Sequence, residues 1–260
     1  MEDIYKKFAY DYDEFGSIDT YLGDEKNFLK ELFAEYKVKS VLDCACGTGQ
    51  HLCMLSDLGF NVSGSDYSES MIEVANTNLK KLGKNISLSQ CDFRYLEDTH
   101  TNKFEAIVCL TTALPHLQTD EDLIIALKSM RKRLNEGGIL VLTQGMTHYT
   151  LSLSPIEVVI NRDEFSRIFI KEHDSEFQTI HILDLFHSEN RVENNQYDIK
   201  YRILFDDDYN RLLSEAGFNS VCIYGDYDKS NYDKKSRRLI VVAVNEWHDF
   251  SPANCSLVES

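Results

Sequence analysis

The segment Val41–Gln50, VLDCACGTGQ, constrains the fold of this chain more than any other stretch. Its apolar start reads as the end of a buried strand, with Asp43 at the carboxyl end of that strand. Gly47 and Gly49 then turn the chain tightly into a segment whose leucines have helical spacing. A strand, a glycine turn and a helix form the first half of a nucleotide-binding α/β unit. The glycines let the backbone approach a ligand closely, and the acid can accept hydrogen bonds from a cationic or hydroxylated ligand.

A glycine turn alone is also compatible with any other α/β protein. It is not the dinucleotide fingerprint, because Leu52 stands where that pattern needs a small residue. The spacing of the next acid is more specific. Asp66 ends a second predicted strand, 17 residues after Gly49, where an acid typically binds the two ribose hydroxyls of a nucleoside. A third predicted strand ends in Asp92-Phe93, which suits an adenine amino group and the face of its ring.

Three consecutive predicted strands thus place Asp43, Asp66 and Asp92 along one edge of one sheet. These carboxylates would repel a polyphosphate cofactor, and the glycine turn contains no Lys or Arg to offset them. S-adenosylmethionine fits this edge, because its sulfonium and ammonium groups are cationic and it has no phosphate. An NAD-dependent enzyme is less compatible with the turn and with the third acid.

With these features in order, the chain resembles the class I S-adenosylmethionine-dependent methyltransferases. The resemblance covers about residues 38–145 and includes the first motif (VLDCACGTG), the ribose acid (GSDYSESMIEVA), the adenine motif (QCDF) and the following strand (FEAIVCL). It implies S-adenosylmethionine as the cofactor and a Rossmann-like α/β fold with a seven-stranded sheet whose last strand is reversed. The cofactor-binding residues that we expect are Tyr21, Asp43, Ala45, Gly47, Gly49, Asp66, Tyr67, Met71, Asp92, Phe93 and Leu110.

The opening DTYLGDEKNFLKELF, together with LPHL and LNEGGILVL, resembles glycine and glycine/sarcosine N-methyltransferases. In that family a tyrosine that matches Tyr21 lies near the cofactor and the methyl acceptor. The resemblance implies methylation of glycine, sarcosine or a similar amino-acid amine. The chain departs from the family at Gln144–Thr147, where that family has Arg-Asn-Tyr-Asp. The candidate replacements for binding a substrate carboxylate are Arg162, Arg167 and Arg202, which could instead be solvated charges at strand edges.

Methyl transfer from a sulfonium depends on proximity and orientation more than on acid–base groups. We place Tyr21, His116 and Tyr201 around the reacting nitrogen as the catalytic candidates. His116 would also serve as a base if the acceptor were a hydroxyl, although a lone histidine is more often structural. The alternatives to amine methylation are O- or N-methylation of another small metabolite, and a non-catalytic cofactor-binding regulatory protein that has kept the fold.

The chain suits a single domain over residues 1–260, because no linker, repeat or low-complexity tract divides it. Residues 1–36 are predicted to form a helical lid in which Tyr10, Tyr12 and Phe15 exclude water from the site, the alternative being that these side chains only pack the helix. The βα alternation breaks at 146–205, where period-two patterns predict an insertion of three antiparallel strands. This insertion precedes the last helix, predicted at 206–216, and should wall a substrate pocket. The predicted strands of the insertion span about 164–173, 177–187 and 197–204.

The 43 acidic and 27 basic residues give a formal net charge of −16, which disfavours a nucleic-acid partner because such binding depends on neutralising phosphates. No run of about 18 apolar residues could span a membrane, and the start MEDIYKKFAYDYDEF does not read as a signal peptide. Seven cysteines, several on predicted strands, indicate a reducing compartment, and we therefore expect a cytoplasmic protein. The negative net charge favours a small molecule as the methyl acceptor. Cys44 and Cys46 lack a second pair of ligands, and no metal site is predicted.

Overall fold

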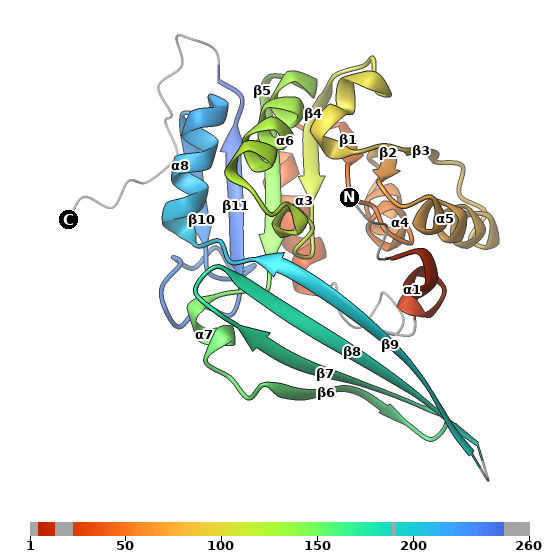
Figure 1. The fold of residues 1–260 in the computed structure, drawn as a ribbon. Helices are drawn as coiled ribbons and strands as arrows, with labels where there is room; N and C mark the ends of the chain where they lie inside the picture. Colours follow the sequence, from red (N-terminus) through yellow and green to blue (C-terminus); the bar gives the residue numbers. More distant parts are fainter. Residues whose placement is uncertain (1–4, 14–22, 189–190, 247–260) are drawn as a thin grey trace.

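The computed structural model describes residues 5–13, 23–188 and 191–246, whose strands form two sheets (Figure 1). The main sheet contains β1 (Ser40–Asp43), β2 (Asn61–Asp66), β3 (Ser87–Gln90), β4 (Phe104–Cys109), β5 (Leu134–Gln144), β10 (Ser220–Tyr224) and β11 (Leu239–Val244). Its order is β10-β11-β5-β4-β1-β2-β3. β11 runs antiparallel to both of its neighbours, and the other neighbouring pairs are parallel. The predicted seven-stranded, Rossmann-like sheet with a reversed last strand is therefore confirmed.

Helices cover both faces of the main sheet (Figure 1). The helices of the described residues are α1 (Tyr5–Tyr12), α3 (Gly23–Glu35), α4 (Gln50–Asp57), α5 (Glu69–Lys81), α6 (Asp120–Arg133), α7 (His148–Leu151) and α8 (Asp206–Ala216), with the 3₁₀ turns η2 (Phe93–Asp98) and η3 (Leu114–His116). Two apolar cores result. Leu42 and Cys44 pack with α6 and α8 on one face, whereas Val41 packs with α3 and α4 on the other. Burial on both faces explains why the central strands read as near-continuous apolar runs.

The second sheet, which we call the lid sheet, contains β6 (Ile156–Arg162), β7 (Phe165–His173), β8 (Phe177–Ser188) and β9 (Arg191–Arg202), paired antiparallel in that order. The three predicted strands are present as β7, β8 and β9, but the expectation of only three was incomplete because β6 adds a fourth. β6 is an edge strand whose Ile156 and Val158 are both 59% exposed. Ile156 and Val158 therefore face outward, and the strand lacks the burial pattern that marks its neighbours.

The lid sheet follows β5 through α7 and lies across the carboxyl ends of the parallel strands of the main sheet (Figure 1). Helix α1 lies between the lid sheet and α5. Its Asp11 accepts a hydrogen bond from Tyr197 of β9 at 2.6 Å, and its Tyr10 donates one to Glu73 of α5 at 3.2 Å. Within the described residues of the expected lid over 1–36, α1 thus touches the lid sheet. Helix α3 instead buries Phe28 and its apolar neighbours in the core beneath the main sheet.

Candidate functional site

A first cavity of about 370 Å³ opens at the carboxyl ends of β1 and β2, with α1 on its other side. This edge collects ligands in open α/β sheets, because the loops that leave adjacent parallel strands diverge there. The cavity brings together seven of the residues that the sequence analysis selected. These residues are Ala45, Gly47, Asp66, Tyr67, Met71, Phe93 and His116.

The glycine turn leaves open space beside the first cavity. Gly47 has a φ of +51°, which favours glycine, and a Cβ built there would meet no atom within 4 Å. Gly49 has a φ of +88°, and its Cα packs instead against α5, where an added Cβ would lie 3.4 Å from the Cβ of Ala75. Gly47 therefore faces the cavity, whereas Gly49 holds α4 close to α5.

Asp66 links the glycine turn to the end of β2. One of its carboxylate oxygens accepts a hydrogen bond from the backbone N–H of Gly47 at 2.9 Å, and the other accepts one from Ser68 at 2.9 Å. Ser68 in turn caps α5, because its hydroxyl accepts a hydrogen bond from the N–H of Met71 at 3.4 Å. These contacts hold the Asp66 carboxylate in one orientation at the wall of the first cavity.

Asp43 lies beneath the glycine turn and is 1% exposed. Its Oδ1 accepts a hydrogen bond from the N–H of Ala45 at 3.2 Å, whereas its Oδ2 is buried and has no hydrogen-bond partner among the described residues. Burial raises the pKa of Asp43 to about 6. The charge of His51 opposes this rise in the pKa, and Asp43, which was expected to bind the cofactor, lines none of the first, second or third cavities among the described residues.

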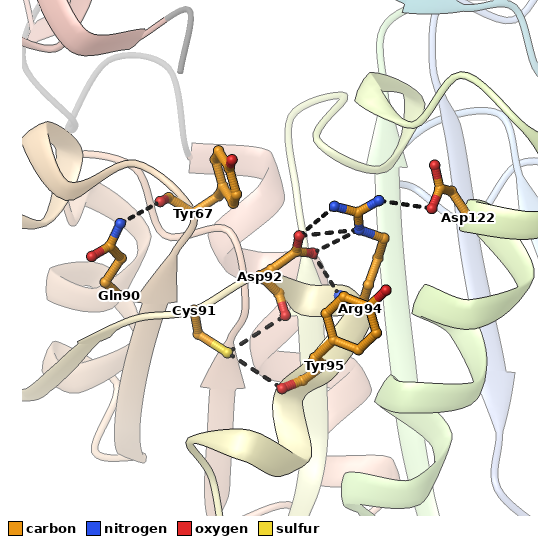
Figure 2. A network of polar contacts seen from close by, with 7 residues as sticks. All are labelled: Tyr67, Gln90, Cys91, Asp92, Arg94, Tyr95 and Asp122. Atoms are coloured by element: carbon orange, nitrogen blue, oxygen red, sulfur yellow. Dashed lines mark hydrogen bonds and ion pairs between the residues drawn. The ribbon is translucent and has the colours of Figure 1, made fainter. Parts of the chain in front are cut away.

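Asp92 lies beside the first cavity in a polar network (Figure 2). Arg94 donates to both of its carboxylate oxygens, through Nε at 3.1 and 3.0 Å and through Nη2 at 2.6 Å, and reaches Asp122 through Nη1 at 2.7 Å. The hydrogen bonds with Asp92 raise the pKa of Arg94. Asp92 therefore does not line the cavity, although the next residue, Phe93, does. A ligand amino group that reached Asp92 would share it with Arg94.

A second cavity of about 260 Å³ lies between α1, the loop after β4 and the lid sheet. Tyr5, Tyr12 and Thr111 line both this cavity and the first one, so the two cavities meet at these side chains. Of the three expected lid aromatics, Tyr12 lines both cavities, Tyr10 is 61% exposed, and Phe15 lies outside the described residues, whereas Tyr5 was missed. The sequence signal was present, because Tyr5, Phe8 and Tyr12 fall on one face of α1 at helical spacing.

A cluster of Tyr5, His116 and Tyr201 occupies the junction of the two cavities. The Tyr5 hydroxyl lies 2.8 Å from Nε2 of His116, and the rings of His116 and Tyr201 have centroids 4.7 Å apart. Burial lowers the pKa of His116 to about 4 and raises the pKa of both tyrosines. The three side chains are therefore uncharged at neutral pH. The two predicted catalytic candidates that the structure describes, His116 and Tyr201, are thus neighbours, and Tyr21 lies outside the described residues.

The backbone at the same junction adopts an uncommon conformation. Thr111 and Thr112 have φ values of +54° and +67°, a region that non-glycine residues seldom occupy. Hydrogen bonds to Thr143 of β5 hold this geometry, from the N–H of Thr112 to the carbonyl at 2.8 Å and from the N–H of Thr111 to the hydroxyl at 2.9 Å. The neighbouring strand thus supports a strained turn where both cavities meet.

A third cavity of about 390 Å³ lies on the far side of Gly47 and also touches Thr111. Its wall holds a buried pair that sequence reasoning missed, in which Nε2 of His51 lies 3.3 Å from a carboxylate oxygen of Glu25. Burial alone would lower the pKa of His51, but the hydrogen bond and charge of Glu25 outweigh it and raise the value. Arg238 also lines the cavity. The glycine turn is therefore flanked by both acidic and basic groups.

The three arginines predicted to bind a substrate carboxylate lie away from these cavities. Arg167 is completely buried and paired with Asp184, while Arg202 pairs with Asp120 at 2.7 Å. The guanidinium of Arg162 lies over the ring of Phe165, 5.6 Å from its centroid. None of them lines the first, second or third cavity. Leu110, predicted to touch the cofactor, is likewise buried in the core beneath the sheet.

The described residues contain no group of three or more His, Cys, Asp or Glu side chains that could hold a metal ion. Nor is any helix among them long and apolar enough to cross a membrane. The cysteines are in mixed states. Five carry free, buried thiols (Cys44, Cys46, Cys53, Cys91 and Cys109), whereas Cys222 is disulfide-bonded.

Comparison with known proteins agrees with this geometry. Residues 41–138 match a family model described as a methyltransferase domain. The chain is 28% identical over 212 residues to a glycine/sarcosine N-methyltransferase of Parasynechococcus marenigrum (strain WH8102), a match that covers 79% of this chain and 72% of that protein. Among solved structures, an S-adenosylmethionine-dependent methyltransferase from Clostridium acetobutylicum superposes with a TM-score of 0.80 at 20% identity, covering 94% of this chain and all 100% of that one.

A second solved structure adds a bound cofactor to the comparison. It is an amino pentose methyltransferase from Micromonospora echinaspora with S-adenosylmethionine bound, with a TM-score of 0.71 at 19% identity, covering 94% of this chain and 99% of that one. At such identities the structural likeness establishes a common fold.

Proposed function

Because this chain contains a class I S-adenosylmethionine-dependent methyltransferase domain, with S-adenosylmethionine as its cofactor, we propose that it transfers the methyl group to an amine nitrogen of a small molecule. The observation that carries this proposal is the uncharged cluster of Tyr5, His116 and Tyr201 at the junction of two cavities. One cavity suits the cofactor and the other suits an acceptor, so the cluster lies where the methyl group would pass.

The residues around the first cavity fit the cofactor. The open space beside Gly47 accommodates a ligand close to the backbone, and the Asp66 carboxylate is oriented to accept hydrogen bonds from two ribose hydroxyls. The unpartnered Oδ2 of Asp43 adds negative charge beside a cationic ligand. When bound, the cofactor would supply a methyl group to the lone pair of a neutral amine, with the C–S electron pair staying on sulfur and the proton of the methylated amine passing to water.

The cluster would orient the acceptor rather than store its proton. An amine must be neutral to attack, and an uncharged surrounding neither repels it nor holds it as an ion. His116, with a pKa near 4, can accept a hydrogen bond from the amine but is a weak base. The hydroxyls of Tyr5 and Tyr201 supply further hydrogen bonds that fix its direction. Such positioning accounts for most of the catalysis that a transfer of this kind needs.

Glycine and sarcosine are two specific candidates for the amine acceptor, because the chain is similar to a glycine/sarcosine N-methyltransferase. Their carboxylate would need a cation in the acceptor cavity. The cation among the described residues that line it, Lys171, is already paired with Glu157. The similarity to a glycine/sarcosine N-methyltransferase therefore favours these acceptors, whereas the charges of the described residues that line the second cavity do not.

The test is transfer of a labelled methyl group from S-adenosylmethionine to a panel of amines, phenols and carboxylic acids. Tyr5→Phe and Tyr201→Phe should lower kcat for the best amine by about tenfold or more, because each removes an orienting hydrogen bond. Their cofactor dissociation constants should stay close to wild type. Tyr10→Phe is the matched control, since Tyr10 is on the same helix as Tyr5 but is 61% exposed. Cofactor binding without turnover of any acceptor would favour a non-catalytic role, and a preference for phenols would favour O-methylation.

A further inference from the structure

The proposed function leaves open which class of amine is methylated, and the residues that line the second cavity bear on this question. We infer that this cavity takes an amine attached to an apolar body, rather than a short zwitterionic amino acid; the inference rests on the proposed function. Its basis is the distribution of apolar, hydroxyl and charged groups around the cavity wall.

One part of the cavity wall is apolar and comes from α1 and the lid sheet. Phe8 of α1 packs with Ile182 and Ile199 of the lid sheet into a small core, each 5% exposed or less. Phe169 and Ile180, half-buried on β7 and β8, extend this core along the inner face of the lid sheet. A ligand that fills this part of the cavity removes apolar surface from water, which favours a hydrocarbon or aromatic group there.

Neutral polar groups lie where the second cavity meets the first, and Thr112, Thr150 and Gln178 add further neutral polar groups to its wall. The side chains shared by both cavities are Tyr5, Tyr12 and Thr111, and Tyr201 lies beside them. These groups are neutral donors and acceptors of hydrogen bonds, as an amine requires. The amine end of the ligand would therefore point toward the methyl donor, with its apolar body against the lid sheet.

Charged groups at the second cavity neutralise each other. Glu157 of β6 and Lys171 of β7 form an ion pair, and the Glu157 side chain is 54% exposed, which puts the pair at the rim. Arg167, on the same strand as Lys171, is turned into a separate buried pair with Asp184. A glycine or sarcosine carboxylate would lose its hydration among apolar side chains without a cation from the described residues to receive it.

The volume of the second cavity also favours an acceptor larger than glycine. Its volume of about 260 Å³ is just below the range of roughly 300–1,000 Å³ that holds drug-sized ligands. Glycine, the smallest amino acid, would leave most of this apolar space unfilled. An arylalkylamine has an aromatic ring for the lid-sheet end and an amine for the tyrosine end.

The experiment uses 2-phenylethylamine as the probe, with glycine and sarcosine as the competing acceptors, and measures labelled methyl transfer to each. We expect kcat/KM for 2-phenylethylamine to exceed both by at least about tenfold, since apolar pockets discriminate by factors of this size. Ile180→Trp, which fills the cavity from β8, should raise KM for the probe by about tenfold or more while leaving the cofactor dissociation constant within about twofold.

Ile170→Trp is the matched control, because Ile170 lies on β7 between two cavity residues but points to the opposite, solvent face and is 41% exposed. It should change neither constant. Ile180→Ala, which enlarges the cavity, keeps the test usable if the tryptophan variant misfolds, and it too should raise KM for the probe. Higher kcat/KM for glycine or sarcosine, or an unchanged KM in both Ile180 variants, overturns the inference and leaves the proposed function intact. Cofactor binding with no methylation of any amine overturns both.

Discussion

Arg167 and Asp184 lie directly opposite each other on β7 and β8 and form an ion pair that is completely buried. Nε and Nη2 of Arg167 each lie 2.6 Å from a carboxylate oxygen of Asp184. Nη2 also donates to the backbone carbonyl of Asp11 at 2.8 Å, which ties the lid sheet to α1. Arg167 is therefore not a solvated strand-edge charge, and its guanidinium lies over the rings of Phe8 and Phe165. The anion that such burial requires is an internal aspartate, the alternative to a substrate carboxylate.

The first prediction is that this pair supports the fold. Arg167→Met should lower the free energy of unfolding by about 3–5 kcal/mol, because Asp184 would remain buried without a partner. The double variant Arg167→Met/Asp184→Leu should recover most of the loss in urea denaturation. Arg191→Met, at an arginine whose side chain is 75% exposed and paired with Glu193, is the control and should stay close to wild type. If Arg167→Met is stable but has a raised KM for an amino-acid acceptor, Arg167 binds the substrate instead.

The second prediction separates backbone strain from cofactor contact at the glycine turn. Gly47 and Gly83 both have positive φ values, +51° and +65°, and an added Cβ would meet nothing within 4 Å at either position. Alanine at either site should therefore cost a similar strain of about 1 kcal/mol. In calorimetry, Gly47→Ala should weaken S-adenosylmethionine binding by tenfold or more, whereas Gly83→Ala should bind normally. Equal affinities in the two variants would mean that the cofactor does not approach Gly47.

The third prediction concerns Asp66. Asp66→Ala should weaken cofactor binding by at least about tenfold, since each hydrogen bond from a ribose hydroxyl to a charged acceptor contributes roughly 1.5–3 kcal/mol. Asp207→Ala, on the exposed side of α8, is the control for the loss of one negative charge. A normal dissociation constant for the Asp66 variant in titration calorimetry would contradict the assignment.

The fourth prediction uses the titration of His116. Burial lowers its pKa from 6.5 to about 4, so the unfolded chain takes up the proton first as the pH falls. The folded state is therefore penalised progressively from about pH 6.5 down to pH 4. Between pH 7 and 5 this amounts to roughly 2 kcal/mol. His116→Gln should thus lose less stability than wild type over this interval.

Urea titrations at the two pH values would measure the difference, with His173→Gln as the control because His173 is exposed on the lid sheet. The raised pKa of Asp43 has the opposite sign, since it favours the folded state in acid, but it is common to all three proteins and cancels in the comparison. Identical pH dependence of wild type and His116→Gln would place His116 in a more hydrated setting than its burial indicates.

The sequence predicted features that depend on neighbours along the chain. Asp43 and Asp66 were found because they end β1 and β2, and Asp92 because it follows β3 by two residues, and the sheet brings such strand ends to one edge. The glycine turn was found for the same reason, since its shape requires glycine where it occurs. These local patterns were sufficient for the main sheet and for seven of the residues that line the first cavity.

What the sequence did not reveal depends on partners far apart in the chain. Tyr5 meets His116 across 111 residues, and Glu25 meets His51 across 26. Nothing in the local pattern of either pair indicates its partner. The ion pair between Asp92 and Arg94 was missed for another reason. Two oppositely charged residues at positions i and i+2 can form an ion pair, but this spacing does not require one. β6 was missed because an exposed edge strand lacks one-sided burial.

The strained turn at Thr111 and Thr112 affects which substitutions selection would retain at these two positions. Each threonine in the left-handed region carries a cost of about 1–2 kcal/mol, which glycine would largely remove. Selection for heat resistance alone would therefore replace these threonines, whereas selection for turnover would retain whatever the turn contributes at the meeting point of the cavities. A laboratory population evolved under the first pressure should gain glycine or asparagine at these positions and lose activity in the same step, so thermal robustness and catalysis are opposed at this single turn.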